Sequence, residues 1–467
     1  MAINDFIKIL NGWYWQRDVL RIALQFLGVE CDEFDLEENL CKLSDSENLK
    51  KAMSEISAEY LTVCGRQICE EKQKIGTGRS VKKEEYLSYY INFENPPVEP
   101  SMSVWQKDKI LWYVDLEVYN NNNSTIALLD QEKVYQFLEP IYQLVKRTLS
   151  YFGIRCIAVS SGRGYNFICS VPVNSPVFRE LLDIGRCIEP TLAEEQHRFP
   201  VCKRNKPVPW QLEQGFKGSM RLVIFFIGLI IDEARRISNL NVEMSDQGTE
   251  GISMDPTFIT RSVHTSSIAI PGSIYLKLHY NKDNEHVDPS VKENTPPPIR
   301  LIRLYNGHEN FPDFRKLIEV RSDYYQALDH LAGQVGYIPD GSEGLHNLIK
   351  LYRSSPLYYF HQLMDSVEHD PYWDWWKGYK NIDGICASVP QISHILRNPN
   401  PSLLQPDALN YLINKLMDHG MHPKHVAGIV RAQYEDPSNG FYLFKNMTQP
   451  NGQMAGLKFL APKDILG

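Results

Sequence analysis

The sequence lacks the marks of a secreted or membrane-spanning protein. Its nine cysteines are scattered and form no CxxC pair, which predicts reduced thiols and a cytoplasmic location. No basic leader followed by an apolar core opens the chain, so we expect no signal peptide. The most apolar run, residues 222–231, is shorter than the ~20 residues that span a bilayer, and it predicts a buried helix rather than a membrane partner.

An excess of positive charge is also missing. The 467 residues carry a formal net charge of −8, with 43% hydrophobic and 23% charged residues. This composition is typical of a soluble globular protein and excludes wholesale disorder. Binding of nucleic acid is not predicted by the global charge and would need a local basic surface.

Hydrophobic patterning divides the chain into a mixed middle region and two helical flanks. We predict an α+β fold with an N-terminal helical region over 1–98, a mixed module over 99–282, a proline-rich linker over 283–300 and a C-terminal helical domain over 301–467. In the N-terminal region, apolar residues recur at helical spacing from Met53 to Ile68.

The mixed module alternates strands with helices. An amphipathic helix is predicted over 130–152, with Pro140 inside it and a stop at Gly153. Strands are predicted over 109–119, 154–161 and 165–173, and further helices near 176–187 and 219–237.

Two carboxylates interrupt the otherwise apolar strand KILWYVDLEVYN, residues 109–120. Asp115 and Glu117 are two residues apart, so in a strand they point to the same face. Two desolvated carboxylates repel each other, and this repulsion is usually relieved by protonation of one carboxylate or by binding of a cation. Taken alone, the pair is also consistent with an edge strand whose polar face meets water.

Two later segments add groups that suit metal and phosphate. SGRGYN, residues 161–166, is a glycine-rich turn whose backbone N–H groups and arginine suit phosphate oxygens. Asp255 adds a third carboxylate, and Lys277, after the segment PGS at 271–273, adds a positive charge. Two divalent ions about 3.5–4 Å apart can hold both reacting oxygens of a phosphoryl transfer.

In order, spacing and flanking sequence, four motifs resemble the catalytic module of the archaeo-eukaryotic primase (AEP) superfamily, the primase-polymerases. They read YVDLEVY, SSGRGYNFI, ISMDP and IAIPGSIYLK, and the resemblance covers residues 100–282. It implies an AEP catalytic module with an RRM-like sheet, and template-directed nucleotidyl transfer as a DNA or RNA primase-polymerase.

The resemblance also implies the site residues and the ligands. Asp115, Glu117 and Asp255 would be the catalytic residues and would bind two Mg²⁺ or Mn²⁺ ions. The residues around the phosphates of the incoming nucleotide would be Ser161, Gly162, Arg163, Gly164, Asn166, Ser273 and Lys277. The expected partners are a DNA or RNA template and primer, nucleoside triphosphates, and a helicase or other replication or defence proteins.

Three positions depart from the family pattern. The turn histidine aligns with Asn166, the arginine before Pro-Gly-Ser with Ala269, and the following histidine or asparagine with Tyr275. An amide can bond a phosphate oxygen but carries no positive charge. The pattern therefore also fits a relative that binds nucleotide or nucleic acid in a replication or defence complex without synthesis.

Other interpretations remain open. A metal-dependent nuclease shares the acidic residues, although many such enzymes place a lysine two residues after the second carboxylate, where this chain has Tyr119. Cys187, His197 and Cys202 provide only three loosely spaced ligands, fewer than the four of a structural zinc site, so zinc is not expected.

Two stretches of the C-terminal flank could also contact nucleic acid. The aromatic run 370–381 offers stacking faces to bases, and 422–434 offers a basic helix with Lys424, His425 and Arg431. Packing within a helical domain explains both stretches.

Overall fold

The structure is a computed structural model, and the residues that it describes are 17–30, 56, 58, 61–65, 79–81, 97–104, 106–120, 129–185, 210–244, 249–254, 267–275, 295, 297–366, 382–397, 406–421, 425–426, 429, 444–448 and 454–459. The chain divides into two units. The first unit comprises residues 1–177, 226–255 and 267–347, and the second comprises 178–225, 256–266 and 348–467.

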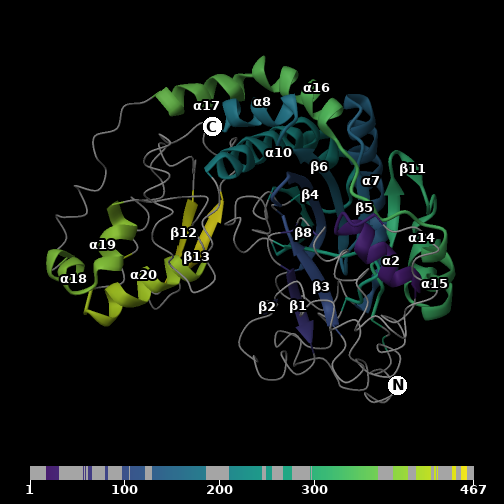
Figure 1. The fold of residues 1–467 in the computed structure, drawn as a ribbon, viewed down its shortest axis with the longest axis horizontal. Coiled ribbons are helices and arrows are strands. Elements are labelled where there is room, and N and C mark those ends of the chain that lie inside the picture. The colour runs from purple at the N-terminus through teal and green to yellow at the C-terminus, as the bar shows by residue number, and fades with distance from the viewer. Residues whose placement is uncertain are drawn as a thin grey trace. The chain divides into compact units, whose positions relative to one another are not determined.

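A seven-stranded sheet forms the centre of the first unit, in the order β11-β10-β5-β6-β4-β8-β7 (Figure 1). All neighbouring strands are antiparallel except β7 and β8. The strands are β4 (Lys109–Asn120), β5 (Ile157–Ser160), β6 (Gly164–Pro172), β7 (Val242–Glu243), β8 (Glu250–Ser253), β10 (Ile302–Tyr305) and β11 (His308–Glu309).

The middle of this sheet is a split β-α-β arrangement. The chain runs from β4 through helix α7 (Gln131–Phe152) to β5, returns antiparallel as β6 between those two strands, and reaches β8 on the far side of β4 after helices α8 (Pro176–Ile184) and α10 (Trp210–Ile237). The strand order β5-β6-β4-β8 is that of a ferredoxin-like βαββαβ sheet. The predicted α+β class is confirmed at this general level.

Helix α7 begins and ends at the residues that its sequence indicates. The Asp130 side chain caps the first turn by accepting a hydrogen bond from the backbone N–H of Lys133 at 3.1 Å. Gly153 ends the helix with φ 74°, a left-handed conformation that glycine adopts without strain. The predicted helix over 130–152, the strands that flank it and the helices near 176–187 and 219–237 are therefore confirmed.

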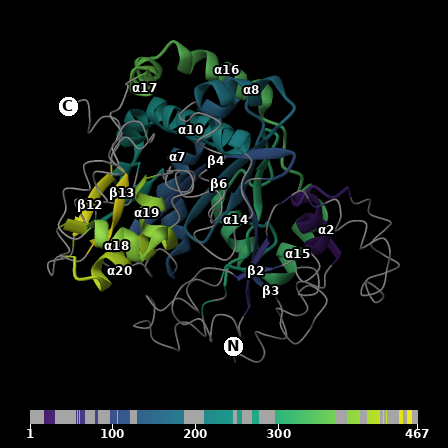
Figure 2. The same ribbon diagram turned by 60° about the vertical axis from the view of Figure 1, so that its left-hand side comes forward.

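Helices α7 and α10 pack on one face of the sheet, and the acidic pair lies on the other. Tyr135 and Tyr142 of α7 pack against Tyr165 of β6, with ring centroids 5.1 and 4.6 Å apart. Phe226 of α10 packs edge-on against Trp112 of β4 at 5.4 Å. In Figures 1 and 2, α7 lies beside the central strands. Because side chains alternate along a strand, Asp115, Glu117 and Asn166 belong to the opposite face.

A second, four-stranded antiparallel sheet lies in the same unit. It has the order β2-β1-β3-β9, formed by β1 (Leu61–Gly65), β2 (Arg79–Val81), β3 (Pro97–Ser103) and β9 (Ser267–Ala269). The prediction of helix from Met53 to Ile68 is wrong at Leu61–Gly65. Long-range pairing with β3 outweighs the local helical spacing in this segment.

The first unit also extends past the predicted linker. β10 pairs with β5 in the central sheet, although residues 301–467 were expected to be a separate helical domain. Short helices follow, with α14 (Phe314–Arg321) packed on α7, and α15 (Tyr324–Ala332) packed on α14 and on α2 (Arg17–Phe26) (Figure 1). Of the linker 283–300, only residues 295 and 297–300 are among those described.

The second unit is mainly helical. The buried Arg221 of α10 donates to the Ile184 carbonyl at the end of α8 at 2.6 Å, and Phe225 packs against Tyr352. Its further elements are α16 (Ser342–Arg353, shared with the first unit), α17 (Pro356–Ser366), α18 (Ile382–Ser388), α19 (Pro390–Arg397), α20 (Pro406–Asp418), and a hairpin of β12 (Phe444–Thr448) and β13 (Met454–Phe459).

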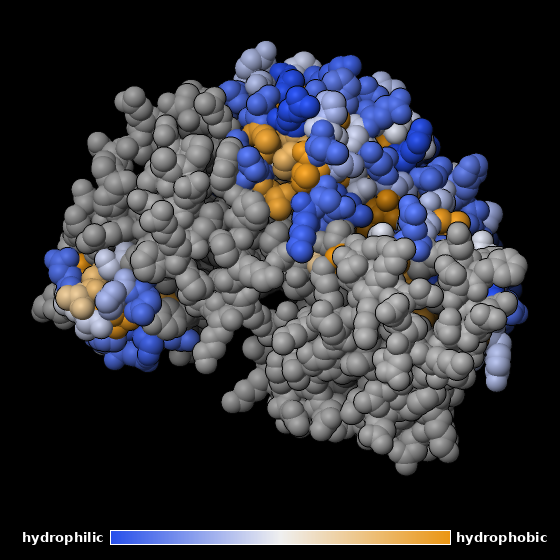
Figure 3. Space-filling view, in the orientation of Figure 1, coloured by the Kyte–Doolittle hydropathy of each residue, from blue (hydrophilic) through white to orange (hydrophobic). Residues whose placement is uncertain are grey.

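Helix α10 is longer than the apolar run that predicted it. Residues Gln214–Ile237 are long and apolar enough to cross a membrane by length and composition, and 78% of their most apolar window is buried. On the face shown in Figure 3, hydrophilic side chains predominate among the described residues, and apolar side chains gather in small patches.

Candidate active site

The predicted carboxylates lie on β4, a central strand of the main sheet. Asp115 is paired with Asn166 of β6, and Glu117 with Gly164, so the acidic pair stands directly across from the glycine-rich turn. Both carboxylates are partly exposed, whereas Val114, Leu116 and Val118 between and beside them are buried. The alternation expected from the sequence is therefore present, and it occurs in the middle of the sheet rather than at its edge.

Each carboxylate has a side-chain partner from the turn. The Asn166 amide donates to Asp115 Oδ1 at 2.7 Å, and Arg163 Nη2 donates to Glu117 Oε2 at 2.7 Å. The Arg163 and Glu117 side chains are 18% and 24% exposed, so this ion pair is shielded from much of the solvent. The Glu117 charge raises the pKa of Arg163 despite its burial. The turn thus contributes a neutral donor to Asp115 and a cationic donor to Glu117.

A network of buried donors fixes the turn itself. The Ser161 N–H donates to the Gly164 carbonyl at 2.8 Å, and the Tyr135 hydroxyl lies 2.7 and 3.1 Å from the carbonyl oxygens of Ser161 and Gly164. Arg321 Nη2 donates to the Ser161 carbonyl at 2.6 Å, and Gln131 donates to the Gly162 carbonyl at 2.8 Å. Helices α7 and α14 therefore hold the turn from outside the sheet.

Gly162 and Gly164 are required for space rather than for a positive φ, because neither is among the described glycines with positive φ. A Cβ on Gly164 would lie 1.8 Å from the Leu116 carbonyl oxygen, and a Cβ on Gly162 would lie 2.0 Å from the Tyr275 ring. Gly164 thus allows the turn to approach β4 closely, and Gly162 leaves room for the ring of Tyr275.

That tyrosine belongs to the Pro-Gly-Ser segment, which the fold brings beside the turn. Gly272 adopts φ 78°, and its N–H donates to the Arg300 carbonyl at 2.7 Å. The Arg300 guanidinium lies 4.8 Å from the centroid of the Tyr275 ring. The structure therefore brings Tyr275 against the turn, and it adds the buried charge of Arg300, which the sequence did not indicate.

Several buried polar atoms of this region lack a hydrogen-bond partner. Among the described residues they include Arg163 Nε, Ser253 Oγ and Ser273 Oγ. Ser253 is paired with Glu117 across β8 and β4 and is 4% exposed. Because buried polar atoms in proteins are usually paired, the unpaired Arg163 Nε and Ser253 Oγ beside Glu117 favour a ligand-binding role for this site.

Two predicted residues, Asp255 and Lys277, lie outside the described residues. The role of Asp255 stays a prediction. Among the residues described, no group of three or more His, Cys, Asp or Glu side chains is gathered to hold a metal ion. Asp115 and Glu117 supply two carboxylates, and such oxygen ligands suit Mg²⁺ or Mn²⁺.

Other candidate residues cannot be placed. Cys187, His197, Cys202, the aromatic run 370–381, Lys424 and Arg431 lie outside the described part of the chain. Cys156 and Cys169 are free and buried, and burial raises the pKa of Cys156 to about 12, so this thiol stays protonated near neutral pH.

Sequence reasoning missed Arg300, Arg321 and Tyr135. Arg300 is the last residue of the predicted linker, and Arg321 was assigned to the C-terminal domain. Tyr135 is one of several apolar-face residues of an amphipathic helix. The only local signal is that Arg321 and Tyr135 are polar groups in otherwise apolar surroundings.

Comparison of the chain with protein-family models, with curated proteins and with solved structures gave no match.

Proposed function

We propose that this protein is a metal-dependent nucleotidyltransferase, a primase-polymerase of the AEP kind. The observation that carries the proposal is the placement of Asp115 and Glu117 on a central strand, within hydrogen-bond distance of Asn166 and Arg163 from the glycine-rich turn. Carboxylates for cations and a turn with a guanidinium for phosphates are thereby brought to one face of one sheet.

The topology of the sheet supports the same proposal. The family resemblance implies an RRM-like sheet, and the β5-β6-β4-β8 order has the connections of such a sheet. Both helices of the βαββαβ unit that have described contacts with these strands, α7 and α10, pack on the face away from the acidic pair. The acidic pair lies on the opposite face, where Asp115 and Glu117 are partly exposed among buried neighbours.

Each residue has a defined part in the proposed reaction. Asp115 and Glu117 would hold two divalent ions, and Asp255 would complete the set. The bound ions would lower the barrier by stabilising the attacking and leaving oxygens. Arg163, Lys277 and the N–H groups of the turn would bind and orient the triphosphate. Positioning and charge neutralisation supply most of the rate acceleration in phosphoryl transfer, so no protein base or covalent intermediate is required.

The proposal is tested by primer extension and de novo priming with Mn²⁺. Wild type is compared with Asp115→Ala plus Glu117→Ala, and we expect incorporation to fall by at least about 10³-fold, since each lost charge-stabilising group costs roughly 10²–10³. Thr148→Val is the control, since this half-buried residue near the end of α7 donates its hydroxyl to the Leu144 carbonyl of the same helix. Equal incorporation by wild type and the double variant would reject the catalytic assignment.

A second function, binding of nucleotide or nucleic acid without synthesis, is favoured by the position of Tyr275. Its ring lies against Gly162, where the family has a smaller polar side chain, and Ala269 provides no guanidinium. Titration of a nucleoside triphosphate with and without Mn²⁺ separates the two functions. Metal-dependent binding with no incorporation on any DNA or RNA template would favour the second.

A further inference from the structure

We infer that the Glu117–Arg163 ion pair couples the two halves of the proposed site, so that a divalent cation and a triphosphate bind cooperatively. This inference rests on the proposed function and adds a role for Arg163. The Arg163 guanidinium forms an ion pair with Glu117 when neither ligand is bound. When a divalent ion binds Glu117, the guanidinium pairs with the phosphates instead.

The geometry makes Arg163 a competitor of the metal. Its Nη2 lies 2.7 Å from Glu117 Oε2, the oxygen of a carboxylate that the metal also requires. A guanidinium keeps its proton in proteins, so Arg163 cannot relieve the contact by becoming neutral. Like charges at such short range repel strongly in a partly buried site, and a dication beside Glu117 therefore displaces the guanidinium.

A displaced arginine needs a new counter-charge. The Arg163 side chain is only 18% exposed, and its Nε has no hydrogen-bond partner among the described residues. A guanidinium that stayed in this partly buried position without a nearby anion would carry much of the free-energy penalty of a buried, unpaired charge. A triphosphate lying along the turn supplies that anion, since its oxygens accept two parallel guanidinium hydrogen bonds. The metal therefore improves the site for phosphate, and the phosphate improves the site for metal.

Asp115 accepts a hydrogen bond from a different side chain of the turn. Its donor from the turn is Asn166, a neutral amide 2.7 Å from Oδ1, which does not oppose a cation by charge. The coupling should therefore depend on residue 163 and on its charge, and only weakly on residue 166.

The test uses one substitution with opposite effects on the two ligands. With Arg163→Met, Mn²⁺ alone should bind about 10-fold more tightly than to wild type, and a nucleoside triphosphate at fixed free Mn²⁺ should bind about 10-fold more weakly, within the range of measured site-to-site coupling. Calorimetry with Mn²⁺ alone and fluorescence titration of a labelled triphosphate give the two affinities. Arg163→Lys keeps the charge and should keep the weak Mn²⁺ binding.

Two controls separate the outcomes. Arg155→Met removes an exposed arginine that pairs with exposed Glu343 at 3.9 Å, and it should change neither affinity. A misfolded variant would lose the binding of both ligands. If Arg163→Met binds Mn²⁺ no more tightly than wild type, the inference is overturned. If Mn²⁺ binding is instead absent from wild type, or unaffected by Glu117→Ala, the proposed function itself fails.

Discussion

At the scale of single residues, Gly164 acts through the space that it leaves free. It faces Glu117 in the register of β6 against β4, and its backbone approaches Leu116 so closely that no side chain fits. The Val118 N–H donates to the Arg163 carbonyl at 3.0 Å beside this contact. The missing side chain therefore sets the distance between the acidic pair and the turn.

Gly164→Ala should destabilise the protein by roughly 1–3 kcal/mol, because the added Cβ forces β4 and β6 apart as an oversized core residue would. The measurement is urea denaturation followed by circular dichroism. Gly228→Ala is the control, since Gly228 lies within helix α10 with nothing within 4 Å of the added Cβ, and it should stabilise by about 0.5–1 kcal/mol. Equal effects of the two substitutions would contradict the role of close approach.

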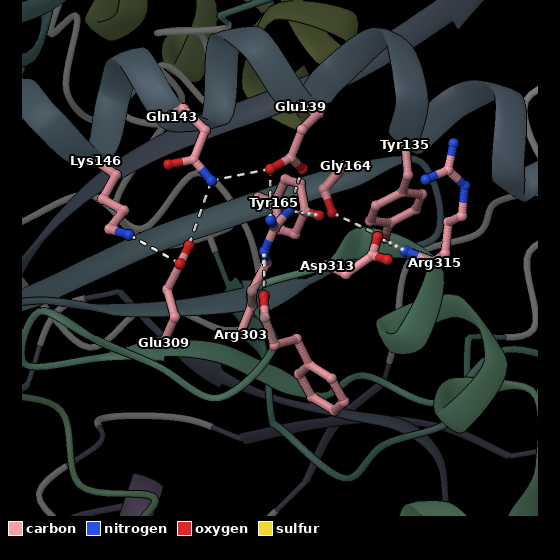
Figure 4. Close-up of polar contacts among 11 residues, drawn as sticks. Tyr135, Glu139, Gln143, Lys146, Gly164, Tyr165, Arg303, Glu309, Asp313 and Arg315 are labelled. Carbon is pink, nitrogen blue, oxygen red and sulfur yellow. Dashed lines mark hydrogen bonds and ion pairs between the residues drawn. The ribbon is translucent and has the colours of Figure 1, made fainter.

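At the scale of elements, the buried ion pair between Arg303 and Glu139 ties β10 to helix α7 (Figure 4). Arg303 Nη1 and Nη2 donate to the two Glu139 oxygens at 2.7 and 2.8 Å, and Nη1 also contacts the Tyr165 hydroxyl. The guanidinium lies 3.7 Å from the centroid of the Tyr142 ring. Burial alone would lower the pKa of Arg303, but the Glu139 hydrogen bonds and nearby tyrosines outweigh it and raise the pKa.

Glu139→Gln should destabilise the protein by about 3 kcal/mol, because it leaves a fully buried guanidinium without its counter-charge. Thermal and urea denaturation give the change in the free energy of unfolding. Arg303→Met plus Glu139→Gln removes both charges and should recover part of the loss. A double variant as unstable as the single one would show that packing, rather than the unpaired charge, is responsible.

Glu343→Gln serves as the comparison for an exposed pair. The Glu343 and Arg155 side chains are 85% and 67% exposed, and an ion pair of this kind contributes about 0–1 kcal/mol. The contrast between Glu139 and Glu343 thus measures the effect of burial.

At the scale of the whole molecule, each unit contains a buried or half-buried histidine whose pKa is lowered. Burial lowers the pKa of His330 in the first unit to about 4, and its ring packs 3.9 Å from that of Phe311. In the second unit, burial and the nearby Arg221 charge lower the pKa of His361, which contacts the Tyr352 hydroxyl. Both histidines therefore stay neutral near neutral pH.

Acid should destabilise the first unit between about pH 6.5 and 4. In that range the unfolded chain binds a proton at His330 that the folded state does not, so the free energy of unfolding falls as the pH falls. His330→Gln should flatten this dependence, even if the loss of ring packing lowers stability at every pH. Urea denaturation of both proteins at several pH values measures the slopes, and parallel slopes would contradict the assignment.

Local sequence patterns determined a large part of this protein. The alternation in residues 109–119 predicted β4 and the shared face of Asp115 and Glu117, and the apolar spacing with Gly153 predicted the extent of α7. Such features follow from the geometry of a single strand or helix, in which side-chain positions repeat every two or every 3.6 residues. They needed no knowledge of the rest of the chain.

Only the tertiary structure decided which of these elements meet. It placed β6 between β4 and β5, so that Arg163 lies against Glu117, and it brought Tyr275 and Arg300 to the turn from more than a hundred residues away. It also made Leu61–Gly65 a strand and added β10 to the central sheet. Strand pairing depends on hydrogen bonds and packing between distant segments, and the local pattern of a segment does not contain its partner.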